Sequence, residues 1–348
     1  MNKWFRQGMA GMAILGMGIW LAACQFPQVS NRAEEQEVCS KELFAMDTYM
    51  TFSAYGKERE KAVDEAIEEV ERLDRLWSVS SKDGEIYQIN EKKEGAISKD
   101  TVKVIRQAQN LYQDTEGVFD LTVYPLMDLW GFTTGNYRVP EKKERMALLK
   151  EVNQASLQVE DRYLRIDKNQ KIDLGGIAKG YTSQKIMQMW KKIGVKSGMV
   201  SLGGNVQVLG KKPDQTLWHV GIRNPLDPDG EVMGVVETED QAVITSGGYE
   251  RYFKENKKSY CHIIDTQTGA PAESDVLSVT IVSKDGTLAD GLSTSLFIMG
   301  KEKAVTFWRR KKDQFDMILV GTDGGLYASE GLQGSFTSSQ KIQWITFR

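Results

Sequence analysis

From about residue 41 to Arg348 the sequence has no proline- or serine-rich linker, no repeat of about 20–50 residues and no low-complexity stretch. Roughly 300 uninterrupted residues form either one large domain or two closely joined lobes. Hydrophobic residues make up 41% of the chain and charged residues 27%, which is typical of a globular protein. The pattern therefore predicts a folded unit over 41–348 rather than a string of separate modules.

Long amphipathic segments and short apolar runs are mixed along this unit. The helical period predicts five helices, over residues 57–77, 99–115, 141–151, 178–193 and 289–311. Short runs between them, such as Tyr49–Ala54, Trp218–Ile222 and Ser278–Val282, predict strands. The two kinds of segment do not alternate in the regular order of a doubly wound sheet. We therefore expect an α+β fold with mostly antiparallel sheets flanked by helices.

The N-terminus has the layout of a lipoprotein signal peptide. A basic start precedes the apolar run Gly8–Ala23, which is shorter than the roughly 20 residues of a spanning helix. The run ends at Cys24, so Leu21–Cys24 resembles a bacterial lipobox, whose cysteine carries acyl chains such as palmitate. A plain signal peptide with a chance cysteine is the alternative. We expect a signal peptide over 1–23, then an acylated Cys24 and a polar tether over 24–40.

Such an anchor implies a lipid-anchored protein at the extracytoplasmic face of a bacterial cell membrane. The net charge of −3 and the pI of about 5.7 do not indicate a nucleic-acid partner. Two histidines and three cysteines exclude a histidine-rich zinc site, a CxxC pair and a disulfide-dense scaffold. Any metal must bind mainly to oxygen ligands, which favours Mg²⁺ or Ca²⁺.

Two segments contain adjacent glycines. Asp173–Tyr181 places Gly175 and Gly176 between a strand and a helix, where the backbone can approach an anionic ligand closely. It lacks the spacing of a dinucleotide fingerprint and the Lys-Ser/Thr ending of a Walker loop. Ser201–Asn205 is a second glycine pair at a strand junction. Taken alone, each segment is typical of a tight turn.

Two further segments carry polar groups suited to ligand binding. Ile244–Tyr252 offers hydroxyls, backbone N–H groups, a tyrosine and an arginine, although a hairpin with a charged strand explains it equally well. In His262–Gly269, the predicted strand over 262–265 begins at His262. A single histidine is more often structural than catalytic. His262 is nevertheless the best candidate for a general base near neutral pH.

The fifth segment, Ala289–Ser295, begins the last predicted helix. Asp290 and Thr294 are four residues apart, so a carboxylate and a hydroxyl share one helix face. That pair suits a hard cation completed by a carbonyl, waters and phosphate oxygens. In isolation, capping of the helix N-terminus by Asp290 is the simpler interpretation.

The order of these segments resembles the ApbE family of FAD:protein FMN transferases. The resemblance runs from about Phe44 to Leu326 and is far more specific than any one motif. Besides the five segments it includes Met46–Thr48, Leu76–Ser78, Glu85–Ile86, Asn90, Gly117–Val123, Pro125–Leu126 and Leu129–Phe132. Many relatives have glycine where Asp47 stands, so an extra negative charge is expected near the flavin.

The resemblance implies that FAD binds as substrate with its pyrophosphate near Mg²⁺. The implied metal ligands are Asp290, Thr294 and the main-chain carbonyl of Gly176. The implied FAD contacts are Met46, Trp130, Gly131, Phe132, Asp173, Lys179, Ser246, Tyr249, His262, Ile264 and Ser293. His262 and Asp290 are the implied catalytic residues, although a neighbouring carboxylate is an alternative base.

The implied reaction is transfer of FMN from FAD to a threonine or serine hydroxyl of an acceptor protein, with release of AMP. The acceptor is expected to be an extracytoplasmic subunit of a redox complex. Two other hypotheses stay open. A Mg²⁺-dependent FAD pyrophosphatase would use water in place of the hydroxyl and give FMN and AMP. A non-catalytic flavin-binding lipoprotein is disfavoured, because Asp290 and Thr294 are both present.

Overall fold

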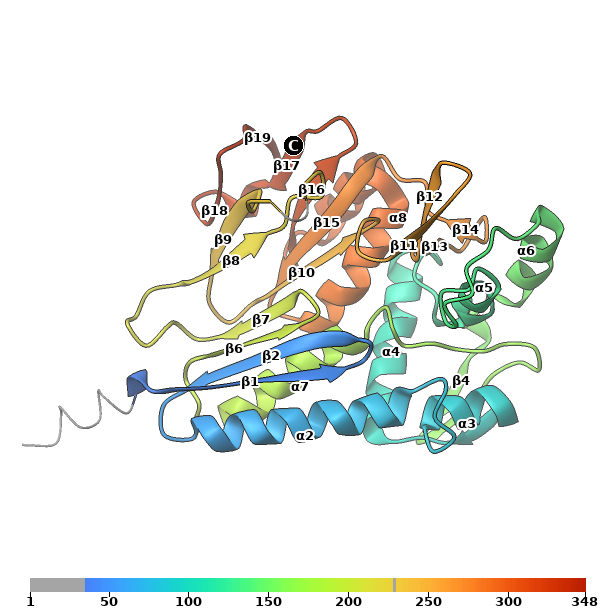
Figure 1. Cartoon of the computed structure of the whole chain (residues 1–348), viewed down its shortest axis with the longest axis horizontal. Coiled ribbons are helices and arrows are strands. Elements are labelled where there is room, and N and C mark those ends of the chain that lie inside the picture. The colour runs from blue at the N-terminus through green and yellow to red at the C-terminus, as the bar shows by residue number, and fades with distance from the viewer. Residues whose placement is uncertain (1–34, 228–229) are drawn as a thin grey trace, which may run out of the picture.

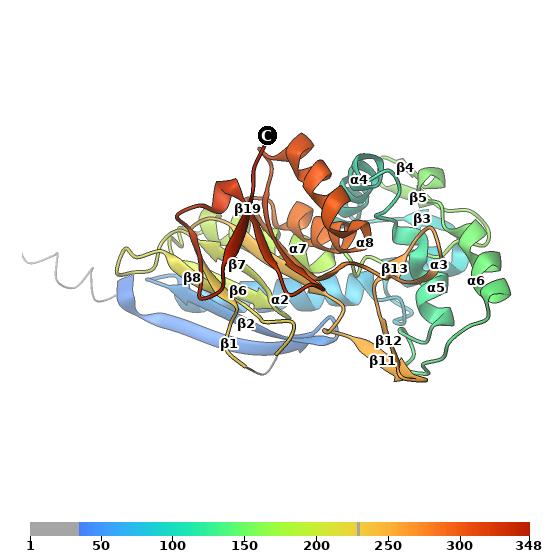
Figure 2. The same ribbon diagram turned by 90° about the horizontal axis from the view of Figure 1, so that it is seen from above.

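A computed structural model describes residues 35–227 and 230–348 of the chain. The predicted signal peptide, Cys24 and the tether up to residue 34 lie outside the described residues. Figure 1 shows a large sheet with long helices packed on one face, and Figure 2 shows the same layers from above. This mixture of mostly antiparallel sheet and flanking helices confirms the predicted α+β class.

Within the described residues the large sheet has nine strands, in the spatial order β1–β2–β6–β7–β10–β15–β16–β17–β19. Neighbouring strands are antiparallel except β17 and β19, which run parallel. The first and last described segments therefore lie at opposite edges of one sheet. In the same spatial order the strands span Val38–Ala45, Thr48–Tyr55, Gly198–Leu202, Asn205–Leu209, Ala242–Gly247, Val276–Ser283, Asp316–Gly321, Leu326–Ser329 and Ile342–Ile345.

Helices cover one face of this sheet and a small sheet covers the other, because alternate residues of a strand point to opposite sides. Ile244 and Ile281 pack with Leu296 in the core beneath the helices. Val243 and Val282 pack into a second core with the small sheet β18–β9–β8. The three strands of that sheet span Phe336–Ser338, Gly234–Thr238 and Trp218–Ile222.

The five predicted helices are all present, with shifted ends. The helices span Arg59–Trp77 (α2), Glu85–Lys92 (α3), Lys99–Asp114 (α4), Tyr124–Leu129 (α5), Lys142–Leu148 (α6), Ala178–Lys192 (α7) and Gly286–Lys311 (α8). As expected, Ser98 caps α4 by accepting a hydrogen bond from the backbone of Thr101 at 3.2 Å. The last helix begins earlier than predicted, because the Asp285 side chain caps it. It is also interrupted at Gly300, whose φ of 75° is non-helical.

Three small sheets complete the described structure around the helices. The first joins β3 (Glu94–Ala96), β5 (Tyr163–Arg165) and β4 (Gln158–Glu160). The second is the hairpin of β11 (Tyr252–Glu255) and β12 (Lys258–Cys261), and the third pairs β13 (Ile264–Asp265) with β14 (Ala270–Pro271). Among the described residues, no helix combines the length and the apolar character that crossing a membrane requires.

Two expectations need correction. The tether was expected to continue to residue 40, but strand β1 begins at Val38 because Cys39 and Ala54 pair across the first hairpin. The strand expected over 262–265 contains only Ile264 and Asp265. His262 precedes it, and its backbone N–H donates to the carbonyl of Arg251 at 3.0 Å.

Candidate functional site

The glycine pair forms a turn that leads into α7, as predicted, but no strand directly precedes it, because β5 ends at Arg165. The backbone N–H of Gly175 donates to Asp173 Oδ1 at 2.8 Å, which closes the turn. Gly175 is exposed and Gly176 is partly exposed, so their backbone is accessible to a ligand. Burial raises the pKa of Asp173, while Lys179 and Arg251 oppose this effect. The start of α7 therefore presents free backbone beside a cation, an arrangement suited to an anion.

Asp290 lies on the buried side of α8, directly against α7. Its Oδ2 accepts a hydrogen bond from the backbone N–H of Gly180 at 2.8 Å, and its Oδ1 accepts one from Asn205 Nδ2 at 2.9 Å. Helix capping by Asp290 is therefore wrong, because Asp285 performs that role. Each carboxylate oxygen accepts one hydrogen bond and keeps further acceptor capacity. Asp290 is thus a fixed, buried anion with room for one more partner.

The second glycine pair contributes to this site through Asn205. Gly203 and Gly204 form the turn between β6 and β7, and both have positive φ, at 64° and 93°. Such a turn places Asn205 at the first position of β7, from which its amide reaches Asp290. Sequence reasoning identified the turn but missed Asn205 as a partner. The only sequence feature that could have indicated this role is the position of Asn205 directly after two glycines.

Hydroxyl groups from β10 and α8 meet beside Asp290. Ser246 Oγ lies 2.8 Å from Ser293 Oγ and 3.2 Å from Thr294 Oγ1. The structure therefore brings Ser246 to Ser293 and Thr294, two predicted residues that lie 47 and 48 positions later in the sequence. Thr294 is partly accessible, whereas Ser293 is buried and also donates to the carbonyl of Asp290 at 2.8 Å. Of these hydroxyls, that of Thr294 is the better placed to reach a ligand.

The oxygen atoms gathered here fit the expected hard cation. Among the described residues there is no group of three or more His, Cys, Asp and Glu side chains that could hold a metal ion. The donor set that the structure brings together is instead one carboxylate and hydroxyls, and the backbone of the glycine turn before α7 is accessible to add the expected carbonyl. Oxygen donors of this kind suit Mg²⁺, which keeps several waters and binds through few protein ligands.

The Lys179 ammonium links this cluster to the His262 side of the site. Its positive charge acts on Asp173, on Glu250 and on His262. Burial raises the pKa of Glu250 to about 7, and Lys179 opposes that shift. Lys179 thus places a positive charge among Asp173, Glu250 and His262.

His262 is neutral at physiological pH and has one free ring nitrogen. Burial lowers its pKa to about 4, and the charge of Lys179 lowers it further. Its Nδ1 lies 3.2 Å from the carbonyl oxygen of Arg251, and because a carbonyl only accepts, Nδ1 carries the proton. The lone pair is then on Nε2. The geometry gives His262 the protonation state of a base, although a weak one.

Trp130, Gly131 and Phe132 form a buried wall beside His262. The Trp130 indole donates to the carbonyl of Gly269 at 2.9 Å, and both aromatic side chains are buried. Gly131 has a φ of 82°, and a Cβ there would lie 2.1 Å from the backbone oxygen of Asn136. The ring centroids of Phe132 and His262 are 6.5 Å apart. Because both rings are buried, mainly the backbone groups of residues 130–132 remain available for the expected contact with the flavin.

The remaining predicted contacts lie around the same region. Met46 and Asp47 form the two-residue turn between β1 and β2, with φ of 49° and 60°. Asp47 adds a negative charge that raises the pKa of Asp173, in line with the expected extra charge. Burial raises the pKa of Tyr249 to about 12, so its hydroxyl stays protonated. Ile264 is buried in the same cluster as Trp130 and Phe132.

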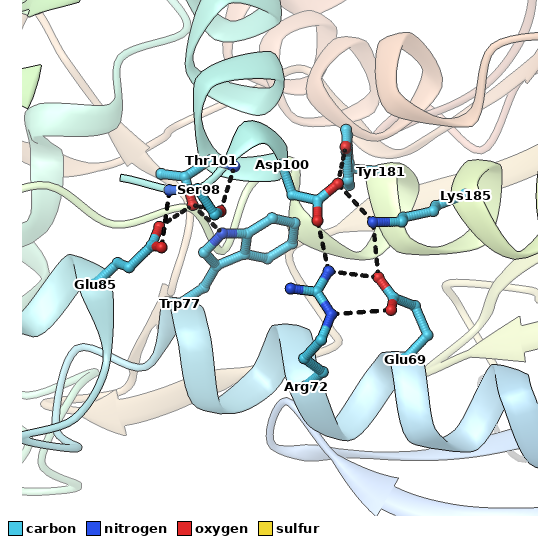
Figure 3. Close-up of polar contacts among 9 residues, drawn as sticks. All are labelled: Glu69, Arg72, Trp77, Glu85, Ser98, Asp100, Thr101, Tyr181 and Lys185. Carbon is cyan, nitrogen blue, oxygen red and sulfur yellow. Dashed lines mark hydrogen bonds and ion pairs between the residues drawn. The ribbon is translucent and has the colours of Figure 1, made fainter. Parts of the chain in front are cut away.

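A network of charges holds α7 against α2 and α4 behind the site (Figure 3). Asp100 accepts from Tyr181 Oη at 2.8 Å, from Lys185 Nζ at 2.5 Å and from Arg72 Nη2 at 2.5 Å. Glu69 pairs with both Arg72 and Lys185. Tyr181 and Lys185 belong to α7, so the network fixes the helix whose first turn carries Lys179 and Gly180. Sequence patterns gave no sign of it.

Comparisons with known proteins agree with this geometry. The model of the ApbE family matches residues 46–319. A FAD:protein FMN transferase of Vibrio cholerae is 33% identical over 288 residues, covering 80% of this chain and 85% of the relative. One of Haemophilus influenzae is 29% identical over 336 residues, covering 91% and 94%.

Solved structures of ApbE proteins are also similar to this chain. The ApbE protein of Thermotoga maritima has a TM-score of 0.80 at 30% identity, covering 86% of this chain and 99% of that chain. A flavin transferase ApbE from Vibrio cholerae has a TM-score of 0.76 at 29% identity, covering 85% and 98%.

Proposed function

This chain belongs to the ApbE family, and we propose that it is a Mg²⁺-dependent enzyme that transfers FMN from FAD to a threonine or serine hydroxyl of an acceptor protein. The acceptor oxygen attacks the FMN-side phosphorus, the bond from that phosphorus to the bridging oxygen breaks, and AMP leaves. The hydroxyl proton passes to a base. FMN remains on the acceptor as a phosphoester.

The single observation that supports this most is the position of Asp290, a buried carboxylate bound by the α7 backbone, on the same helix face as Thr294, whose hydroxyl meets that of Ser246. Asp290, Thr294 and the Gly176 carbonyl would hold Mg²⁺. That ion, when bound, neutralises phosphate charge and orients the anhydride. Lys179 adds a second positive charge close by.

The other residues of the site position the reactants. Neutral His262 accepts the hydroxyl proton through Nε2, while its Nδ1–H donates to Arg251 and fixes the ring. Buried Phe132 packs beside His262, with ring centroids 6.5 Å apart, and so limits the positions of the His262 ring.

We further propose that Cys24 carries a lipid anchor and that the domain works at the extracytoplasmic face of the membrane. Strand β1 begins only 14 residues after Cys24. Such a tether reaches at most about 50 Å when fully extended. The acceptor would then be a membrane-associated redox protein within that distance.

Intact-mass spectrometry of a candidate acceptor after incubation with the full chain, FAD and Mg²⁺ tests the reaction. A gain of one FMN that EDTA abolishes, with AMP released in equal amount, supports the proposal. Free FMN and AMP without acceptor modification would instead establish a FAD pyrophosphatase. Asp290→Asn serves as the matched variant, because it keeps the size of the side chain and removes its charge.

A further inference from the structure

A cavity of about 770 Å³ lies beside the proposed flavin site, bordered by the β11–β12 hairpin. Trp130 and Tyr249 belong both to its lining and to the predicted flavin contacts. The residues that matter for its chemistry are Trp130, Arg145, Tyr249, Lys254, Lys258 and Tyr260. The cavity is therefore adjacent to the reaction centre, yet most of its lining has no part in the proposed chemistry.

Aromatic side chains contribute to the lining of this cavity. One of them, Tyr260, is held from behind, because it stacks on Phe253 with ring centroids 5.1 Å apart and Phe253 stacks on Tyr137 at the same distance. Tyr252 and Val139, which line the cavity, are 44% and 37% exposed. Exposed aromatic and apolar residues around a hollow are typical of a surface that contacts another protein.

Arg145 contributes a positive charge to the lining. Its Nη1 donates to the carbonyl of Thr268 at 3.2 Å, and its guanidinium lies 6.0 Å from the Trp130 ring centroid. Its Nε is buried and has no hydrogen-bond partner in the described part of the chain, so a ligand would meet the Nη groups rather than Nε. The planar guanidinium suits a carboxylate as its partner.

The charge of the lining is positive around Arg145. Lys254 lies over the Tyr252 ring at 5.6 Å, and Lys258 pairs with Glu273. Three basic residues thus face one acidic residue in the lining. Within residues 35–227 and 230–348, no carboxylate lies within 4.0 Å of the Arg145 guanidinium. The surface is complementary to a segment that carries a carboxylate.

We propose that this cavity binds an acidic segment of the acceptor protein, with one carboxylate of that segment on the guanidinium of Arg145. This inference rests on the proposed transferase function. The acceptor lays an apolar side chain against Tyr252 and Tyr260, and the segment leads its hydroxyl past Tyr249 to the site. Arg145 is then a specificity-determining residue that does not touch the reacting atoms.

The test uses the full-length enzyme and an acceptor protein that the wild type modifies with FMN. Initial rates at varied acceptor and saturating FAD are measured for Arg145→Gln and for the matched surface variant Arg75→Gln. FAD affinity and thermal unfolding are measured in parallel. We expect Arg145→Gln to raise the acceptor KM about tenfold, with kcat and FAD affinity unchanged, and Arg75→Gln to match the wild type.

Two further variants identify the contact. Arg145→Lys keeps the charge but lacks the planar guanidinium, so we expect it to restore less than half of the lost affinity. Amide replacement of the paired acceptor carboxylate should raise KM in the wild type and have no further effect in Arg145→Gln. An unchanged acceptor KM in Arg145→Gln overturns this inference alone. Loss of FAD affinity would assign the cavity to the flavin instead, whereas a wild type that modifies no acceptor contradicts the proposed function itself.

Discussion

The carboxylate of Asp290 accepts a hydrogen bond from the backbone N–H of Gly180 at 2.8 Å, across 110 residues of sequence. This contact joins the second turn of α8 to the first turn of α7. It is possible only because residue 180 has no side chain, since a Cβ there would lie 2.2 Å from the carbonyl oxygen of Gly286 and 2.5 Å from Asp290 Cβ. The close approach of the two helices therefore builds the candidate metal site.

We expect Gly180→Ala to destabilise the protein by about 3 kcal/mol or more, because backbone must move to admit the methyl group. Gly176→Ala is the matched control. A Cβ at Gly176 meets only the Phe119 ring, at 3.4 Å, and a carbonyl ligand does not depend on the side chain. Urea unfolding and FMN transfer measure both variants. If Gly180→Ala is as stable as the wild type, then α7 and α8 do not approach each other at residue 180 as closely as described.

Thr294 gives a cleaner test of the metal ligands than Asp290 does. Removal of the Asp290 side chain would strand two buried donors, on Gly180 and Asn205, and so affect folding. Thr294→Val keeps the shape and removes only the hydroxyl, whereas Thr294→Ser keeps the hydroxyl. We expect Thr294→Val to weaken Mg²⁺ activation about 10–100-fold and Thr294→Ser to stay close to the wild type. Equal Mg²⁺ titrations for all three proteins would exclude Thr294 as a ligand.

Asp100 should stabilise α7 in a pH-dependent way (Figure 3). Burial alone would raise the pKa of Asp100, but the bonds from Lys185, Tyr181 and Arg72 outweigh it and lower the pKa to about 2. Its contribution is therefore present above pH 3.8 and lost as the pH falls through about 2. We expect Asp100→Asn to cost about 2–3 kcal/mol at pH 7, with the difference from the wild type shrinking below pH 4.

Urea unfolding between pH 7 and pH 2 checks this, with Asp64→Asn as the control. Asp64 pairs with Lys41 on an exposed surface, where an ion pair contributes about 0–1 kcal/mol. A similar small loss in both variants would show that the network behind α7 adds little to stability.

The sequence predicted α2, α4 and α7 because their buried faces repeat at helical spacing. It did not predict β1, where Lys41 stands at an inward position of the strand and pairs with Asp64 of α2. It also did not predict the β11–β12 hairpin. The turn there uses Asn256 and Lys257 at φ of 50° and 65°, and a lysine gives no sign of that conformation.

The candidate site shows the same limit. The order of motifs identified the family and all the segments that meet, but no local pattern encodes a contact such as that of Asp290 with Asn205. Arg145 likewise has no signal in the sequence, because its significance comes from its place in the lining of the cavity. Periodicity reports which face of an element is buried, whereas partners distant in sequence depend on how the elements pack.

Cys24→Ser tests the anchor separately from the chemistry. We expect the wild type to partition into detergent and to incorporate labelled palmitate, and the variant to do neither. Because β1 begins 14 residues after Cys24, transfer to an acceptor free in solution should be unchanged. Retention of the variant in the membrane fraction would contradict the anchor.

His262 leads to a prediction about the pH dependence of both rate and stability. Burial lowers its pKa to about 4, so the native protein keeps it neutral between pH 4 and 6.5 while the unfolded chain binds a proton there. Protonation of the unfolded chain therefore opposes folding below pH 6.5, so the stability falls as the pH falls from 6.5 to about 4, whereas above pH 6.5 this titration has no effect. The transfer rate should likewise show no break near pH 6.5 that is due to His262.

Ring NMR signals can follow this titration directly, because the chain has only two histidines and His219→Asn assigns the remaining signal to His262. His262→Gln should lower kcat about 10²–10⁴-fold if Nε2 accepts the hydroxyl proton, while FAD affinity stays near that of the wild type. Parallel losses of kcat and FAD affinity would make His262 a binding residue. A native pKa near 6.5 would mean that the ring is not buried as described, and the acid limb of the rate profile would then move up with it.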